Sequence, residues 1–384
     1  MKKNRTLECS IPPFSSRRWT GLDMARTLAA IAVIFSHWKH FSLASYHNES
    51  KFALEPGYKY FRLLYEHGHM GVEFFFILSG FIFFGFYRDK IYYGNISAFK
   101  FLMFRFSRLY PLHFITLLLT CGLQEIYHLE HGSYFIYIHQ NLFHFTLNFA
   151  MASFWGFQKG FSYNGPFWSV SVELIVYIIF FIHSKYIHYI KIVSFILPLG
   201  FFINNYPYPY PPESPILKCM VLFFLGGTLF HIFNAIKNKS FSAYLAYSVC
   251  VISWVFVFTN EYYFPMKNLA LSYMHYGRFL ISFFPIIFLF PSTILSLIFF
   301  DAHKPLRHNK FLFLGNISYS LYLLHFPLQL ISVLGVQYVG YSNEVFSSTA
   351  TLFIFLTSLI YFSHMTYKHF ELPMQSYLRS RFMP

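Results

Sequence analysis

The stretch GVEFFFILSGFIFFGFY, residues 71–87, decides the class of fold, because it contains a single charged side chain, Glu73. A helix needs about 20 predominantly apolar residues to cross the hydrocarbon core of a bilayer. Similar runs recur along the chain, which has 384 residues, of which 56% are hydrophobic and only 11% are charged. Ordinary soluble domains are about 25% charged. The sequence therefore predicts an all-α, polytopic integral membrane protein.

We expect about ten transmembrane helices, each of roughly 15 to 25 residues. They lie at 24–43, 71–87, 108–124, 167–183, 189–203, 216–234, 243–259, 279–300, 314–336 and 347–366. The apolar segment 141–156 contains polar residues and precedes a glycine-rich stretch, so we expect an interfacial or re-entrant helix there, with a further span as the alternative. The transmembrane domain would cover 21–367, between cytoplasmic tails at 1–20 and 368–384.

The formal net charge is +14, with 29 Lys and Arg against 15 Asp and Glu. The basic residues do not gather in one domain but fall between the apolar segments. With both termini in the cytoplasm, every cytoplasmic loop contains Lys or Arg and two outer loops contain none, as the positive-inside rule requires. Topology thus accounts for the charge without a nucleic acid partner. The pattern predicts a multi-pass protein of the cell membrane, or of the inner membrane in a Gram-negative organism.

The potential metal ligands have no spacing typical of a metal site. The four cysteines are scattered, and the histidines of the outer segment 125–166 match no zinc motif. We therefore expect neither a metal nor a bound cofactor.

Ionisable side chains inside membrane spans are functional candidates, because placing them there is costly. The candidates are His37, Glu73, Glu173 and His325. Glu73 and Glu173 begin the second and fourth spans from the outer side. A structural interpretation competes for each. An intramembrane His often hydrogen-bonds to a neighbouring helix, and we favour this interpretation for His325. The structural interpretation of Glu73 is that it lies among the lipid headgroups.

Three arginines mark the cytoplasmic ends of the spans. Arg105 and Arg108 are three residues apart and share a helix face. His37 follows Arg26 by eleven residues, which places it on the same helix face and about 16 Å deeper. The guanidinium group of arginine can form paired hydrogen bonds with a phosphate. Taken alone, Arg105 and Arg108 could instead be positive-inside anchors whose long side chains extend to the membrane surface. The arrangement favours a donor with an anionic head and a long thin arm, such as coenzyme A.

Five segments are more specific as an ordered set than any one of them is alone. They are GLDMARTLAAIAVIFSH (21–37), GVEFFFILSGF (71–81), RFSRLYPLH (105–113), FWSVSVELIVY (167–177) and SYSLYLLHFPL (318–328). In this order and spacing the chain resembles acyltransferase family 3, the membrane-bound polysaccharide O-acetyltransferases, over about residues 21–378.

The resemblance implies a ten-helix bundle that uses acetyl-CoA or another acyl-CoA as co-substrate on the cytoplasmic side. The acceptor would be a carbohydrate, such as O-antigen, exopolysaccharide or a lipid-linked glycan. His37 would be the catalytic histidine, acting as general base or as a covalent acyl carrier. Glu173, or in second place Glu73, would orient and stabilise it. The donor would be held by Arg26, Arg105 and Arg108.

The chain also departs from the family pattern. Glu73 stands where Asp is frequent, and Leu174 stands where a second Glu often follows. Leu324 and Phe326 replace tryptophans that often flank the late histidine. These differences bear on the choice of acceptor more than on the chemistry.

Two other classes of function stay open at this point. A transporter or flippase for a lipid-linked glycan would also be polytopic with charges inside the membrane. A non-catalytic scaffold of an envelope-synthesis complex would tolerate the loss of His37. The sequence fixes neither the acceptor nor the oligomeric state.

Overall fold

The computed structural model describes residues 19–43, 55–186, 192, 194, 196–200, 214–263, 283–303 and 312–383. Within these ranges every regular element is helical and there is no strand, which confirms the all-α prediction. Among the described residues, eight helical segments are long and apolar enough to cross a membrane: Tyr58–Phe86, Ala98–His131, Gly165–Tyr186, Pro215–Ile236, Phe241–Tyr262, Pro285–His303, Ser318–Tyr338 and Thr349–Phe382. The chain is therefore a multi-pass membrane protein.

The helices keep close to the apolar segments of the sequence. The first part of the chain forms α1 (Thr20–Ser36), α2 (Lys39–Leu43), α3 (Tyr58–His67), α4 (Gly71–Phe86), α5 (Arg88–Tyr92), α6 (Ala98–His131), α7 (Leu142–Phe149) and α8 (Trp168–Tyr186). The second part forms α10 (Pro215–Ile236), α11 (Ser240–Tyr262), a π-helix (Pro285–Leu289) that continues into α14 (Phe290–His303), α15 (Leu312–Asn316), α16 (Ser318–Tyr338), α17 (Thr349–Thr366) and α18 (Leu372–Phe382).

The structure refines three of the predicted segments. The first predicted span, 24–43, is divided, because α1 ends before His37 and α2 begins at Lys39. The helix α7 in segment 141–156 has eight residues, too few for the ~20 that a span requires. In the predicted span 189–203, residues 192, 194 and 196–200 are helical, and the others lie outside the described residues.

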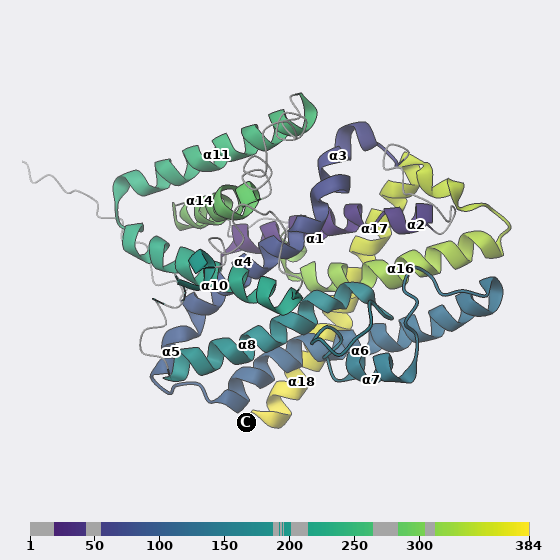
Figure 1. The fold of residues 1–384 in the computed structure, drawn as a ribbon, viewed down its shortest axis with the longest axis horizontal. Helices are drawn as coiled ribbons and strands as arrows, with labels where there is room; N and C mark the ends of the chain where they lie inside the picture. Colours follow the sequence, from purple (N-terminus) through teal and green to yellow (C-terminus); the bar gives the residue numbers. More distant parts are fainter. Residues whose placement is uncertain are drawn as a thin grey trace, which may run out of the picture.

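Helix α1 is central to the bundle. It contacts α3, α4, α14, α15 and α16, and in Figure 1 it lies between the pair α11 and α14 on one side and α16 on another. Its N-terminus is held by Asp301 at the end of α14, whose Oδ2 accepts a hydrogen bond of 2.7 Å from the Gly21 backbone. Side chains along α1 therefore face several different helices.

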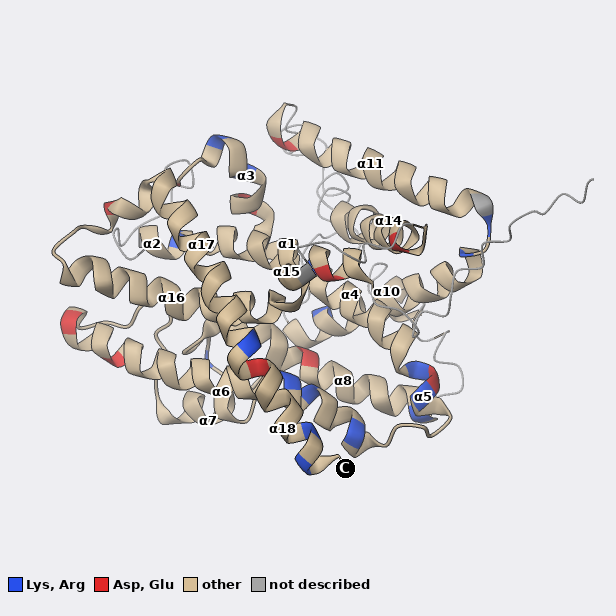
Figure 2. Cartoon of the chain, turned by 180° about the vertical axis from the view of Figure 1, so that it is seen from behind, with Lys and Arg blue, Asp and Glu red and all other residues tan. Residues whose placement is uncertain are grey.

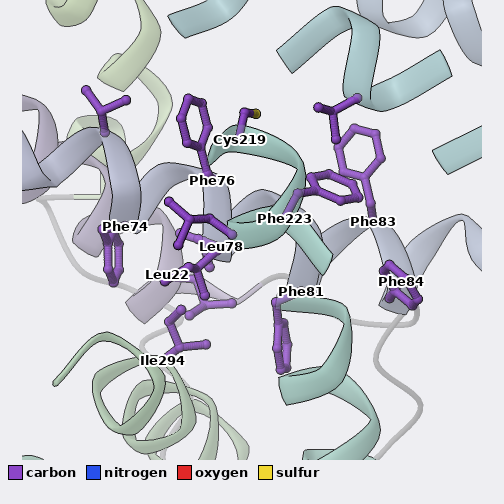
Figure 3. Packing of buried hydrophobic residues seen from close by; sticks show 14 of the residues in the cluster. Leu22, Phe74, Phe76, Leu78, Phe81, Phe83, Phe84, Cys219, Phe223 and Ile294 are labelled. Atoms are coloured by element: carbon purple, nitrogen blue, oxygen red, sulfur yellow. The ribbon is translucent and has the colours of Figure 1, made fainter. Parts of the chain in front are cut away.

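Helices α4 and α10 pack closely, because glycines let the two backbones approach. A Cβ on Gly80 would lie 1.8 Å from the Phe223 carbonyl oxygen, and one on Gly226 would lie 2.0 Å from that of Ile77. Small residues serve this purpose at membrane helix interfaces. Figure 3 shows the apolar layer that results, in which Phe83 and Phe223 meet edge to face with ring centroids 5.5 Å apart.

The buried apolar side chains form two clusters, and α1 and α16 contribute to both. In α1, Val33 belongs to the cluster built mainly on α4, α8, α10 and α14, whereas Ile34 belongs to the cluster with α2 and α17. In α16, Leu323 belongs to the first cluster and Leu321 to the second. Helices α1 and α16 therefore connect the two clusters.

Charge is distributed unevenly along the helices. Helix α6 carries Lys100, Arg105 and Arg108 near its start, and Glu125 and Glu130 near its end. Figure 2 shows Lys and Arg gathered around α5 and α18, at the end of the bundle where α6 begins. Helix α18 packs against α6, so the segment expected as a C-terminal tail adds to this basic end.

Candidate active site

His37 lies in the turn between α1 and α2, where the helix is interrupted inside the membrane domain. Gln329 of α16 holds this turn in place. Its Nε2 donates to the His37 carbonyl oxygen at 3.0 Å, and its Oε1 is 3.0 Å from Nδ1 of His40. Gln329 is fully buried, and its two contacts tie the turn to α16.

A chain of hydrogen bonds fixes the imidazole of His37. Its Nδ1 is 2.8 Å from Nε2 of His325, and Nδ1 of His325 is 2.6 Å from the carbonyl oxygen of Tyr322. A carbonyl only accepts, so we assign the hydrogen of His325 to Nδ1, which leaves its Nε2 as the acceptor. His37 then donates from Nδ1, and its own Nε2 keeps a free lone pair. Such a nitrogen can act as a base.

Of His37, His40 and His325, only His37 is not fully buried. His40 and His325 are 3% and 0% exposed, whereas His37 is partly exposed. It lines a small cavity of about 120 Å³. The residues around this cavity are Val33, His37, His69, Val72, Glu73, Phe76, Trp168, Lys218 and Tyr322.

An ion pair forms another part of the cavity wall. Lys218 of α10 donates from Nζ to Oε1 of Glu73 in α4. Glu73 is only 7% exposed, and its Oε2 is buried with no hydrogen-bond partner in the described part of the chain. His37 and Glu73 therefore line the same cavity, which has both a base and a buried carboxylate in its wall.

A second, larger cavity of about 1250 Å³ adjoins the first. Its walls come mainly from α1, α3, α4, α11 and α14 and are largely apolar. Three residues, His69, Glu73 and Lys218, belong to the walls of both cavities. They form the polar boundary between a wide apolar space and the small cavity at His37.

The arginines gather at the basic end of the bundle. Arg105 donates to the Tyr87 hydroxyl at 2.6 Å, and its guanidinium lies 5.1 Å from the ring centres of Phe83 and Tyr87. Its Nε is buried and has no partner among the described residues. Cation–π contacts with two rings hold the guanidinium in place, and its Nε–H remains available to a ligand.

Arg26 and Arg108 interact electrostatically with each other, and Arg26 also pairs with Asp23 at 3.6 Å. Arg379 of α18 joins them. Its Nε donates to Ser107 at 3.2 Å, and it interacts with both Arg105 and Arg108. Like charges repel when they are brought together. A cluster of four guanidinium groups is therefore suited to an anion.

Glu173 belongs with the arginines. It interacts with Arg26 and Arg105 and with the hydroxyls of Ser79 and Tyr177, and its Oε1 is buried without a partner in the described ranges. We expected Glu173, or in second place Glu73, to orient His37. The hydrogen-bond partner of the His37 ring is instead His325, because α16 brings an imidazole directly against the turn at the end of α1.

Residues 19–367 match the acyltransferase 3 family, described as an acyltransferase domain. The chain belongs to this family. It is also 32% identical over 105 residues to "Protein 2 in picA locus" of Rhizobium radiobacter. That similarity covers 27% of this chain and 45% of the relative, so the chain spans about half the length of that relative. No solved structure matches the chain.

As an acyltransferase, the chain has its predicted site residues in two groups. His37 and Glu73 line one cavity, whereas Arg26, Arg105, Arg108 and Glu173 interact with one another at the basic end. The cavity group can supply a base beside an acceptor, and the arginine group can bind an anion.

The acyltransferase structure also adds three residues that the sequence analysis did not select, Gln329, Lys218 and Arg379. It further makes His325, already a candidate from the sequence, the hydrogen-bond partner of His37. Gln329 and His325 are four residues apart and therefore share a face of α16, a signal present in the sequence. Lys218 lies near the start of an apolar helix, and Arg379 lies in the segment that was expected to be a cytoplasmic tail. Their partners, Glu73 and Ser107, are far away in sequence, so no local pattern connects them.

Proposed function

We propose that this acyltransferase moves an acyl group, acetyl in the simplest case, from acyl-coenzyme A to a hydroxyl of a cell-envelope carbohydrate. O-antigen, exopolysaccharide and lipid-linked glycans are the candidate acceptors. The observation that carries the proposal is the hydrogen bond of 2.8 Å between His37 Nδ1 and His325 Nε2. It leaves Nε2 of His37 available as a base at a cavity wall.

The donor binds at the basic end of the bundle. The phosphates of coenzyme A contact the arginine cluster, where charge-assisted and bidentate hydrogen bonds are strong. Arg105 lies over two aromatic rings and has an Nε without a partner among the described residues. Glu173 balances part of the positive charge. By the positive-inside rule this end faces the cytoplasm, where acyl-coenzyme A is made.

The thioester reaches His37 along α1, since Arg26 and His37 are separated by about 16 Å of helix. His37 Nε2 removes the proton of the acceptor hydroxyl as its oxygen attacks the thioester carbonyl carbon. The carbon–sulfur bond then breaks. The thiolate of coenzyme A takes the proton from His37, so the products are an ester and free coenzyme A. His325 fixes the tautomer and orientation of His37 throughout.

Inside-out membrane vesicles test this function. Acetyl-coenzyme A carrying a labelled acetyl group would be added outside, where the basic end is exposed. We expect label in the envelope glycan, released by mild hydroxide as an ester requires, together with one free thiol per acetyl transferred. Vesicles that move glycan across the membrane without acetyl-coenzyme A, and that acquire no label, would overturn the proposal in favour of a flippase.

A further inference from the structure

The position of Glu73 is set by close backbone packing. A Cβ on Gly68 would lie 1.9 Å from the carbonyl oxygen of Ala32, and one on Gly71 would lie 2.6 Å from that of Ala29. The start of α4 and the turn that precedes it are thus pressed against α1, five to eight residues before His37. Glu73 follows two residues after Gly71, so its carboxylate is held at the cavity and has little freedom to move away.

The carboxylate of Glu73 is only half satisfied. Lys218 neutralises its charge through Oε1, while Oε2 is buried without a partner within the described segments. Leaving a buried acceptor unpaired costs about 1–3 kcal/mol. A group of this kind at a cavity wall is suited to accept a hydrogen bond from a ligand.

The remaining walls suit a ring with both polar and apolar surface. Phe76 and Trp168 meet edge to face, with centroids 6.4 Å apart, and Val33 and Val72 complete the apolar wall. Pockets of mainly apolar surface with a few fixed polar groups orient their ligands through those groups. A sugar ring offers C–H faces to the aromatic side chains and hydroxyls to the polar ones.

We infer that Glu73, Lys218 and Trp168 form an acceptor subsite for a sugar with two neighbouring hydroxyls. One hydroxyl donates to Oε2 of Glu73, and the next presents its oxygen to the acyl group and its proton to His37. Lys218 holds the carboxylate in this orientation. This inference rests on the proposed function, and it specifies which chemical groups of the acceptor the enzyme recognises. A site built to bond one hydroxyl discriminates strongly against acceptors without it.

The place of Glu73 and Lys218 between the two cavities supports this assignment. They line both the wide apolar cavity and the small one at His37. An acceptor that enters from the wide cavity must pass this ion pair before it reaches the base. The pair therefore lies on the acceptor side of the site, away from the arginine cluster.

The experiment compares Glu73→Gln and Glu73→Asp with the wild type, and uses Glu130→Gln at the exposed end of α6 as the matched control. Transfer of acetyl to the endogenous glycan is measured in native membranes. Hydrolysis of acetyl-coenzyme A by water, without acceptor, is measured on the purified proteins. The acetylated position on the sugar is mapped by NMR.

We expect Glu73→Gln to lower the ratio of transfer to hydrolysis at least tenfold and to spread the remaining acetyl over more than one hydroxyl. Glu73→Asp should restore much of the ratio, and Glu130→Gln should match the wild type. Wild-type transfer and a single acetylated position in Glu73→Gln would overturn the subsite. Equal losses of transfer and hydrolysis would also overturn it, because Glu73 would then act with the base.

Failure of the proposed function would look different. His37→Ala would retain both hydrolysis and transfer, whatever Glu73 does. The two claims are therefore separable in one set of measurements.

Discussion

The imidazoles of His37 and His325 are joined by a hydrogen bond of 2.8 Å between Nδ1 and Nε2, although the residues are 288 positions apart in the chain. His325 in turn donates to a backbone carbonyl, so the direction of each hydrogen bond is determined. Because His325 donates to the backbone, it accepts from His37, and Nε2 of His37 is left as a basic nitrogen.

Replacement of His325 tests this arrangement. In His325→Leu, His37 loses the acceptor for Nδ1–H and its tautomer is no longer fixed. Acyl transfer should fall about 100-fold, the lower range for general-base catalysis. In His325→Gln the amide oxygen can accept the same hydrogen bond, so more of the activity should remain. Transfer rates at saturating acetyl-coenzyme A measure the effect.

The exposed His303 at the end of α14 provides the control, since His303→Leu changes the same residue type away from the cavity. Equal activity of His325→Leu and wild type would mean that the hydrogen bond does not serve the reaction. An equal loss of activity in His325→Gln and His325→Leu would mean that a hydrogen-bond acceptor at position 325 is not what the reaction requires.

Arg379 should contribute to donor binding. Removing one charge-assisted contact costs about 1.5 kcal/mol or more, and about 1.4 kcal/mol corresponds to a tenfold change in affinity. We expect Arg379→Ala to raise the KM for acetyl-coenzyme A about tenfold, by less at high salt because the cluster would be screened. Arg381, two residues later on the same helix and exposed, supplies the control variant Arg381→Ala. Identical KM values for both variants would remove Arg379 from the donor site.

Much of the fold follows from the sequence, because apolar length alone marks a membrane helix. The arginines and His37 could also be selected, since charged groups within or beside apolar runs stand out. The partners of these groups were harder to find. His325, Lys218 and Arg379 become meaningful only when distant helices meet, and the periodicity of one helix does not specify which neighbour it faces.

The interruption of the first predicted span shows the same limit. Residues 24–43 read as one apolar run, yet the helix stops before His37 and resumes at Lys39. Gln329 satisfies the backbone carbonyl at this break. The turn is stabilised by a tertiary contact, and nothing in the local sequence, such as Pro or Gly, marks it.

The contact between α4 and α10 should determine stability. Gly226→Ala would place a methyl group 2.0 Å from the Ile77 carbonyl oxygen, so the helices must separate. We expect a loss of about 1–3 kcal/mol or more, as in overpacked cores, seen as a lower melting temperature in detergent. Gly122→Ala in α6 is the control, because a Cβ there meets no atom within 4 Å and alanine favours helix. Equal melting temperatures for both variants would contradict the close packing.

The catalytic role of His37 is tested most directly by mass spectrometry of envelope glycans from cells that express the wild type or His37→Ala at equal levels in the membrane. With the wild type we predict an acetyl-sized mass on the sugar unit that hydroxide removes, and with His37→Ala we predict a loss of at least about 100-fold. Full acetylation by His37→Ala would contradict the assignment of His37 as the base.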